Sequence, residues 1–278
     1  MTRKVTLDEI VNLDYEKISN RIGEFLVSKL EEAGAEGFVV GISGGVDSAT
    51  TFALAVKHVG KEKVLPLIMP DSEVTPEEDV RDAKELVELF GLKPHVINIA
   101  PIVAVYKSAI PIYENDEVDK IPLGNTRARI RMTLLYYYAN KLNRLVLGTG
   151  DRSEILIGYF TKYGDGGVDL LPIGILYKNQ VRRLAVHLGV PEKIAFKPSS
   201  PRLWPGQTAE GELGVSYEQV DLVLYSLFDL KIPPEEVPEA TGVPEEVVKR
   251  ILDLHRKSEH KRQPPPTPPL DIVYEARG

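Results

Sequence analysis

The stretch FVVGISGGVDS at residues 38–48 runs from an apolar segment through a glycine-rich turn into helix-forming residues. The glycines let backbone N–H groups converge on an anion, and the start of the following helix adds partial positive charge. It is not a Walker A loop, because Val46 and Asp47 stand where that loop has its second glycine and its lysine. A carboxylate beside phosphate suggests a divalent cation between the two, so Asp47 suggests Mg²⁺. The alternative is that Asp47 only starts a helix, where acidic residues are favoured.

The chain around this stretch alternates between strand and helix patterns. Helical patterns at 47–59, 76–90 and about 125–140 follow strands, and an earlier helical stripe includes Ile18 and Phe25. The alternation predicts an α/β fold with a doubly wound, mostly parallel sheet and helices on both faces. Ligands of such sheets bind beyond the carboxyl ends of the strands. The predicted strands are FVVGIS (38–43), KVLPLIMP (63–70), PHVINI (94–99) and RLVLGT (144–149).

The C-terminal half predicts helices and two long loops. Helical patterns cover 217–230 and 245–261, while 158–169 and 198–214 are rich in Gly, Pro and polar residues and predict mobile lids. The proline run RQPPPTPPL (262–270) that follows is expected to be extended, because consecutive prolines cannot be helical. We expect one domain over 1–278, with a helical C-terminal part and a tail over 264–278.

Composition excludes several classes of function. The 278 residues carry a net charge of -7, which argues against broad nucleic-acid binding. No window approaches the length of apolar residues that a membrane helix needs. Cysteine is absent, which excludes disulfides and thiolate chemistry. We expect a cytoplasmic protein that binds neither nucleic acid nor membrane.

A further stretch narrows the class of enzyme. Residues 148–185 read GTGDRSEILIGYFTKYGDGGVDLLPIGILYKNQVRRLA, and GNTRAR (124–129), ELGVSYEQVD (212–221) and EHKRQ (259–263) flank them. With SGGVDS, these segments resemble in order the NAD synthetase family of the pyrophosphatase-loop ATP enzymes. The resemblance covers residues 15–263 and implies an adenine nucleotide alpha hydrolase-like fold. This chain departs from it in having GTGD where bacterial members usually have GTDH, and KPSSPRLWPGQ in the second loop.

The resemblance also implies the roles of particular residues. Asp47 and Glu154 would hold Mg²⁺, and Lys178 would act beside them in catalysis. Each residue also has an alternative without a function: Asp47 and Glu154 could be acids at the start of a helix, and Lys178 could be a surface lysine. ATP would be bound by Gly41, Ile42, Ser43, Gly44, Gly45, Val46, Asp47, Ser48, Thr149, Lys178 and Ser200. Deamido-NAD would be bound by Arg129, Lys162, Asp169, His260 and Lys261.

The implied reaction converts deamido-NAD, ATP and ammonia into NAD, AMP and pyrophosphate through an acyl-adenylate. It is the last step of NAD biosynthesis. Because the chain has no cysteine for an amidase triad, we expect free ammonia or an amidase on another chain as the nitrogen source. Two alternatives are another adenylating enzyme of the superfamily, such as an RNA-modifying one, and a nucleotide-binding sensor without catalysis.

The segment MTLLYYYA (132–139) bears on assembly. It has one purely polar side chain, Thr133, on a predicted helix, and a helix that is apolar all round must be covered on every side. A partner subunit or the N-terminal helix of the same chain could provide the cover. The family resemblance implies a homodimer with the dinucleotide site at its interface.

Overall fold

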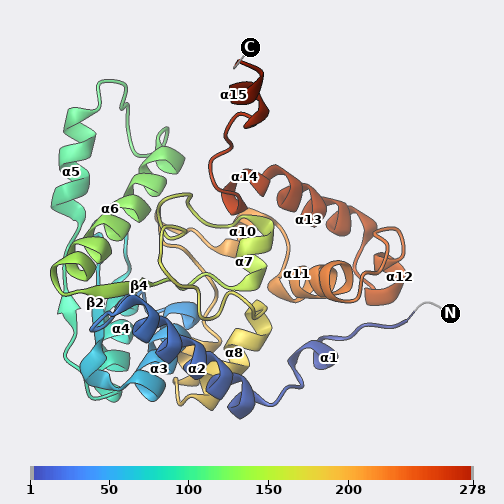
Figure 1. The fold of residues 1–278 in the computed structure, drawn as a ribbon, viewed down its shortest axis with the longest axis horizontal. Helices are drawn as coiled ribbons and strands as arrows, with labels where there is room; N and C mark the ends of the chain where they lie inside the picture. The colour runs from blue at the N-terminus through green and yellow to red at the C-terminus, as the bar shows by residue number, and fades with distance from the viewer. Residues whose placement is uncertain (1–2, 277–278) are drawn as a thin grey trace.

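The computed structural model, which describes residues 3–276, contains a four-stranded parallel sheet that lies among helices on the left in Figure 1. The strand order is β3-β2-β1-β4. In the central strand, Phe38 lies opposite Val64 on one side and opposite Leu145 on the other. The predicted parallel, doubly wound α/β sheet is confirmed. The strands are β1 (Gly37–Gly41), β2 (Val64–Ile68), β3 (His95–Val96) and β4 (Arg144–Leu147).

Helices cover both faces of the sheet because alternate strand residues point to opposite sides. Phe38 and Val40 pack with α2 (Tyr15–Ala33), α3 (Val46–Val59), α4 (Glu77–Leu89) and α8 (Lys178–His187). Val39 packs with α5 (Ala100–Ala109) and α6 (Lys120–Lys141) on the other face. The sheet is thus buried on both sides, as its uninterrupted apolar strands require.

The C-terminal part is helical and has its own apolar core, which includes Tyr217, Leu224 and Ile251. It packs against α8, to the right of the sheet in Figure 1. The chain is extended through the proline run at 264–269. The remaining helices are α1 (Leu7–Val11), α7 (Arg152–Ile157), α9 (Glu192–Ala195), α10 (Ala209–Leu213), α11 (Tyr217–Leu224) with a π-helical turn (Tyr225–Asp229), α12 (Val237–Thr241), α13 (Glu245–Lys257), α14 (Glu259–Arg262) and α15 (Asp271–Glu275).

Several predicted boundaries were wrong. The strand expected at 94–99 has only two paired residues, and the helix expected from 125 begins at Lys120. The helix expected over 245–261 is interrupted at Ser258, whose Oγ donates to the Leu254 carbonyl at 2.7 Å and so competes with the helix backbone. Phe25 is 40% exposed rather than in the core stripe. Along residues 3–276, no helix has both the length and the apolarity needed to cross a membrane.

Candidate active site

A cavity of about 420 Å³ opens between the ends of β1 and β4. The chain continues from β1 to one side of the sheet and β4 lies on the other, so this is the switch point at which doubly wound sheets bind ligands. The cavity brings together segments that are far apart in the sequence. Of the predicted site residues, those that line it are Gly41, Ile42, Ser43, Asp47, Ser48, Thr149, Glu154, Ser200 and Lys261.

The loop after β1 is held in shape by its own hydrogen bonds. Ser48 Oγ accepts from the backbone N–H of Ser43 at 3.1 Å and donates to the Gly45 carbonyl at 3.1 Å. Gly44 has φ +84°, and a Cβ there would lie 2.4 Å from the Asp79 carbonyl oxygen. Only glycine fits such a position. Gly44, Gly45 and Val46 belong to this loop but do not line the cavity.

Lys178 lies at the centre of a buried cluster of charges. Its side chain is fully buried at the start of α8, and its Nζ also lies 4.9 Å from the centre of the Tyr217 ring. The alternative of a surface lysine is therefore excluded. Lys178, which the family resemblance placed among the ATP contacts, does not itself line the cavity. The Nζ contacts Asp47 Oδ2 at 2.7 Å, Glu154 Oε1 at 2.9 Å and Asp151 Oδ2 at 3.0 Å.

The pKa values of this cluster reflect one lysine shared among three acids. Burial opposes the charged ammonium, but the three carboxylates outweigh it and hold the pKa of Lys178 well above its usual value. Burial raises the pKa of Asp151 to about 7 against the lowering influence of Lys178. Burial likewise raises the pKa of Glu154. Three carboxyl groups face one ammonium, so a second cation would pair with the acids that lose their protons to it.

Asp221 ties together the two helices that carry Glu154 and Lys178. Its fully buried carboxylate accepts from Ser153 Oγ at 2.6 Å on α7. It also accepts from the backbone N–H of Asn179 at 2.9 Å on α8. Burial raises the pKa of Asp221 to about 6. Asp221 belongs to the ELGVSYEQVD motif, which the sequence reasoning quoted without assigning this residue a role.

The donor set suits a magnesium ion that ATP helps to hold. Within residues 3–276, no group of three or more His, Cys, Asp or Glu side chains is arranged to hold a metal ion alone. Mg²⁺ is usually held by one or two carboxylates, water and substrate phosphates, so two carboxylates are enough. Asp47 Oδ1 is buried and has no hydrogen-bond partner. Such an atom fits a cation ligand.

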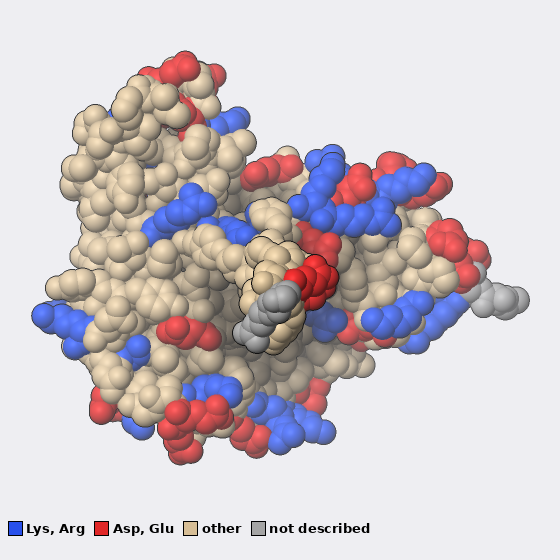
Figure 2. All heavy atoms as spheres, turned by 45° about the horizontal axis from the view of Figure 1, so that its top comes forward, with Lys and Arg blue, Asp and Glu red and all other residues tan. Residues whose placement is uncertain are grey.

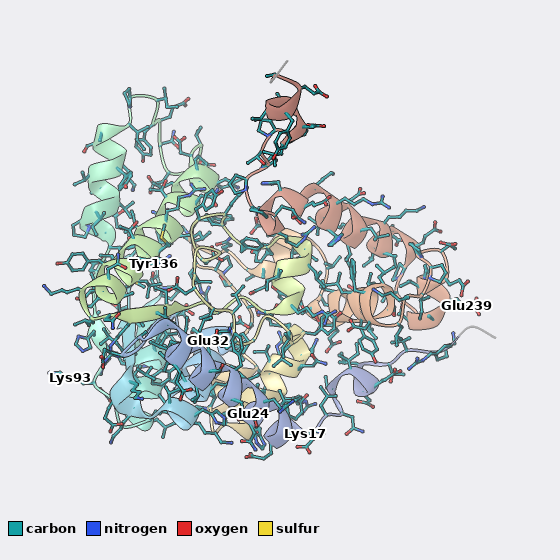
Figure 3. All side chains as sticks on the ribbon, viewed as in Figure 1. Lys17, Glu24, Glu32, Lys93, Tyr136 and Glu239 are labelled. Carbon is teal, nitrogen blue, oxygen red and sulfur yellow. The ribbon has the colours of Figure 1, made fainter. Side chains whose placement is uncertain are left out.

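The residues predicted to bind the dinucleotide lie on one side of the molecule. The Arg129 guanidinium donates to the Lys162 carbonyl at 3.2 Å, and Lys162 Nζ donates to the His260 carbonyl at 2.8 Å. Asp169 accepts from the hydroxyl of Tyr136, which stands on α6 (Figure 3). Of the five residues, Lys261 alone lines the cavity. Arg129 is exposed, whereas Arg127 on the same helix is buried.

The loop over 198–207 forms another wall of the cavity. Ser200 Oγ donates to the Gln207 carbonyl at 2.5 Å, so its hydroxyl is engaged within the loop. Arg202 and Trp204 also line the cavity, and Arg202 Nε contacts Asp79 Oδ2 at 2.7 Å. The sequence alone indicated no role for either residue. The unusual KPSSPRLWPGQ segment was the signal that this wall differs from the family pattern.

A parallel α/β sheet with a glycine loop at its switch point defines a nucleotide-binding α/β protein. A family model described as NAD synthase matches residues 18–265, and the chain belongs to this family. The "NH(3)-dependent NAD(+) synthetase" of Hyperthermus butylicus is 61% identical, with 99% of this chain and 98% of that protein covered.

Two solved structures resemble the fold. The NMN synthetase from Francisella tularensis is 35% identical with a TM-score of 0.79, and 92% of this chain and 99% of that chain are covered. The NH3-dependent NAD synthetase from Campylobacter jejuni, in complex with the nitrate ion, is 29% identical with a TM-score of 0.76. That likeness covers 92% of this chain and 100% of that chain.

Proposed function

We propose that the chain is an ammonia-dependent NAD synthetase, a ligase that forms an amide at the expense of ATP. The deamido-NAD carboxylate attacks the α-phosphorus of ATP, and pyrophosphate leaves. Ammonia then attacks the acyl carbon of the adenylate, AMP leaves, and the nitrogen loses a proton to give the amide of NAD. Membership of the NAD synthase family supports this assignment.

One observation of the site carries the proposal. The glycine loop after β1 and the acidic turn after β4 meet at a single cavity, although they are far apart in the sequence. Ser43 and Ser48 of the loop line this cavity, and Glu154 lines it from the end of the other strand. Such an arrangement can hold a triphosphate and the charge that develops on leaving pyrophosphate.

We assign Mg²⁺ to Asp47 and Glu154, with ATP as co-substrate. When bound there, the ion would neutralise charge on the phosphate oxygens. Lys178 lies against both carboxylates and orients them, and its own charge adds to the positive potential beside the phosphates. The partnerless Oδ1 of Asp47 supports this assignment.

We assign deamido-NAD to the side of the molecule that carries Arg129, Lys162, Asp169 and His260. Lys261 connects this side to the cavity, because its Nζ donates to two carbonyl groups of the 158–169 loop and the residue also lines the cavity. The exposure of Arg129 and His260 favours a site completed by a second copy of the chain. A cytoplasmic homodimer that uses free ammonia is the form that we propose.

Isotope exchange between pyrophosphate and ATP tests the proposed function. We expect exchange that depends on deamido-NAD and on Mg²⁺, because the adenylation step is reversible. Nicotinic acid mononucleotide, which lacks the adenylyl half of deamido-NAD, tests an NMN synthetase activity. That second function is favoured by the likeness to the Francisella structure. Exchange with neither compound contradicts both, and exchange that needs tRNA instead supports an RNA-modifying enzyme.

A further inference from the structure

The three carboxylates around Lys178 do not have the same surroundings. Asp47 and Glu154 line the cavity, whereas Asp151 and Lys178 do not. Asp151 is fully buried at the N-cap of α7, where its Oδ1 accepts from the backbone N–H of Glu154 at 2.8 Å. This bond fixes the carboxylate. Its other oxygen, Oδ2, lies 3.0 Å from Lys178 Nζ and has no hydrogen-bond partner.

A cation at the proposed Mg²⁺ site would take away two of the three partners of Lys178. Asp47 and Glu154 would turn from the ammonium to the metal. A fully buried ammonium without a partner is strongly destabilising. The lysine would then compete with the metal for the same oxygens unless another group kept it paired.

We propose that Asp151 is a positioning residue that keeps Lys178 paired while Asp47 and Glu154 bind Mg²⁺. The inference rests on the Mg²⁺ site of the proposed function. Asp151 is suited to this role because the helix cap anchors one oxygen and leaves the other facing the lysine. It makes the two cavity-facing carboxylates available without leaving a buried charge alone.

The contact between Asp151 and Lys178 distinguishes the GTGD motif of this chain from the bacterial form of the motif. Asp151 is the last residue of GTGD, where the bacterial form of the motif usually has histidine. A histidine carries no permanent negative charge. A carboxylate partner for Lys178 is therefore a property of the GTGD form of the motif, which this chain has.

The proposal is tested by measuring how tightly the chain binds a divalent cation when no reaction takes place. Mn²⁺ replaces Mg²⁺ as the probe, and free Mn²⁺ is followed by its paramagnetic resonance signal as it is titrated into the chain with ATP. Asp151→Asn keeps an acceptor for the cap but loses the charge. We expect its Mn²⁺ affinity to fall about tenfold, the effect of losing roughly one charge-assisted contact.

Asp14 provides a matched control, because it is also an aspartate that caps a helix. Asp14 caps α2 by accepting from the Lys17 backbone N–H at 2.9 Å and is exposed. Asp14→Asn should leave Mn²⁺ affinity unchanged. If Asp151→Asn folds poorly, Asp151→Ser repeats the test. Serine is also favoured as a cap residue, but its side chain is too short to reach the lysine.

A double-mutant cycle separates the proposed role from a general effect of charge. In a Lys178→Met background there is no ammonium to hold, so Asp151→Asn should cause no further loss of Mn²⁺ affinity. An equal loss in both backgrounds overturns the proposal, as does an unchanged affinity in both single Asp151 variants. A wild-type chain that binds ATP but no metal overturns the Mg²⁺ site itself, and this inference with it.

Discussion

Asp47 combines two properties that suit a ligand contact. Its side chain is 20% exposed, while its Oδ1 is buried without a partner. Asp47→Asn keeps the shape and removes the charge. We expect a folded chain whose kcat for NAD formation falls at least about a hundredfold, because a group that stabilises charge on the phosphates is lost. Near-ultraviolet circular dichroism and steady-state rates at saturating Mg²⁺ measure the two effects.

Glu154→Gln should behave in the same way, since Glu154 faces the same cavity. Glu245→Gln is the control, because Glu245 is an exposed acid in the first turn of α13. If either site variant keeps wild-type turnover, the shared-metal assignment is wrong.

Asp221 predicts a pH dependence of stability. Its pKa rises from 3.8 to about 6 on folding because burial disfavours the charged form. The stability that it contributes is fully present below about pH 4 and is lost as pH rises through about 6. Asp221→Asn has no such ionisation. We expect its free energy of unfolding to fall less steeply than that of the wild type between about pH 4 and pH 7.

Denaturant unfolding at several pH values, without ATP or metal, measures the two slopes. Asp253→Asn, an exposed acid in α13, should keep the wild-type slope. Parallel curves for wild type and Asp221→Asn would show that Asp221 does not titrate in this range.

The sequence identified Asp47 and Glu154, the two acids that line the cavity, but not the buried residues that contact them. Asp47 and Glu154 belong to recognisable motifs that follow strands. The burial of Lys178 depends on three carboxylates that come from two separate strand ends. Asp151 lies in a quoted motif, yet only the fold shows which way its two oxygens point.

Among the structural elements, the 158–169 loop is held partly by Lys261 near the C-terminal end of the chain. Lys261 Nζ donates to the Gly158 and Phe160 carbonyls, each at 2.7 Å. Lys261→Met removes both bonds. We expect thermolysin to cut this loop roughly tenfold faster, because two charge-assisted bonds oppose its local opening. ATP with deamido-NAD should slow cutting in the wild type.

The matched control is Lys257→Met in the last turn of the neighbouring helix α13, where the lysine is exposed. It should leave the cutting rate unchanged. Equal rates with and without both ligands would remove the idea that 158–169 and 198–214 close over the site.

The strands and the long helices were the elements that sequence predicted best. Their apolar periodicity is local and survives in the fold, as for α3 and α4. Short elements such as α7, α9 and α10 were missed because they carry too few residues for a periodic signal.

At the scale of the whole molecule, the lobe of α5 and α6 presents few charged side chains on the face seen in Figure 2. Tyr137 is 61% exposed and Val105 63% exposed on these two helices. We expect a homodimer through this lobe, because exposed apolar patches of this kind mark interfaces. Tyr137→Asp should shift the sedimenting mass from twice 30.9 kDa toward 30.9 kDa.

Leu89→Asp is the matched control. Leu89 is also 61% exposed but lies on α4, across the sheet. It should leave the mass unchanged. A wild-type chain that is monomeric at low micromolar concentration and fully active rules out an obligate dimer. The single-domain organisation over 1–278 also stays a prediction.

The pairing of β1 with β4 has a consequence for how the chain acquires its activity. Phe38 and Leu145 lie opposite each other although more than a hundred residues separate them along the chain. Closing so long a loop is entropically costly and slows folding. The glycine loop and the acidic turn meet only when this pairing forms, so ATP affinity should return during refolding no earlier than the slowest recovery of sheet structure. Stopped-flow binding of a fluorescent ATP analogue, set beside far-ultraviolet circular dichroism, would reveal any earlier return. We therefore expect the nucleotide site to form late in folding, and a nascent chain released before β4 would hold the glycine loop but lack its opposite wall.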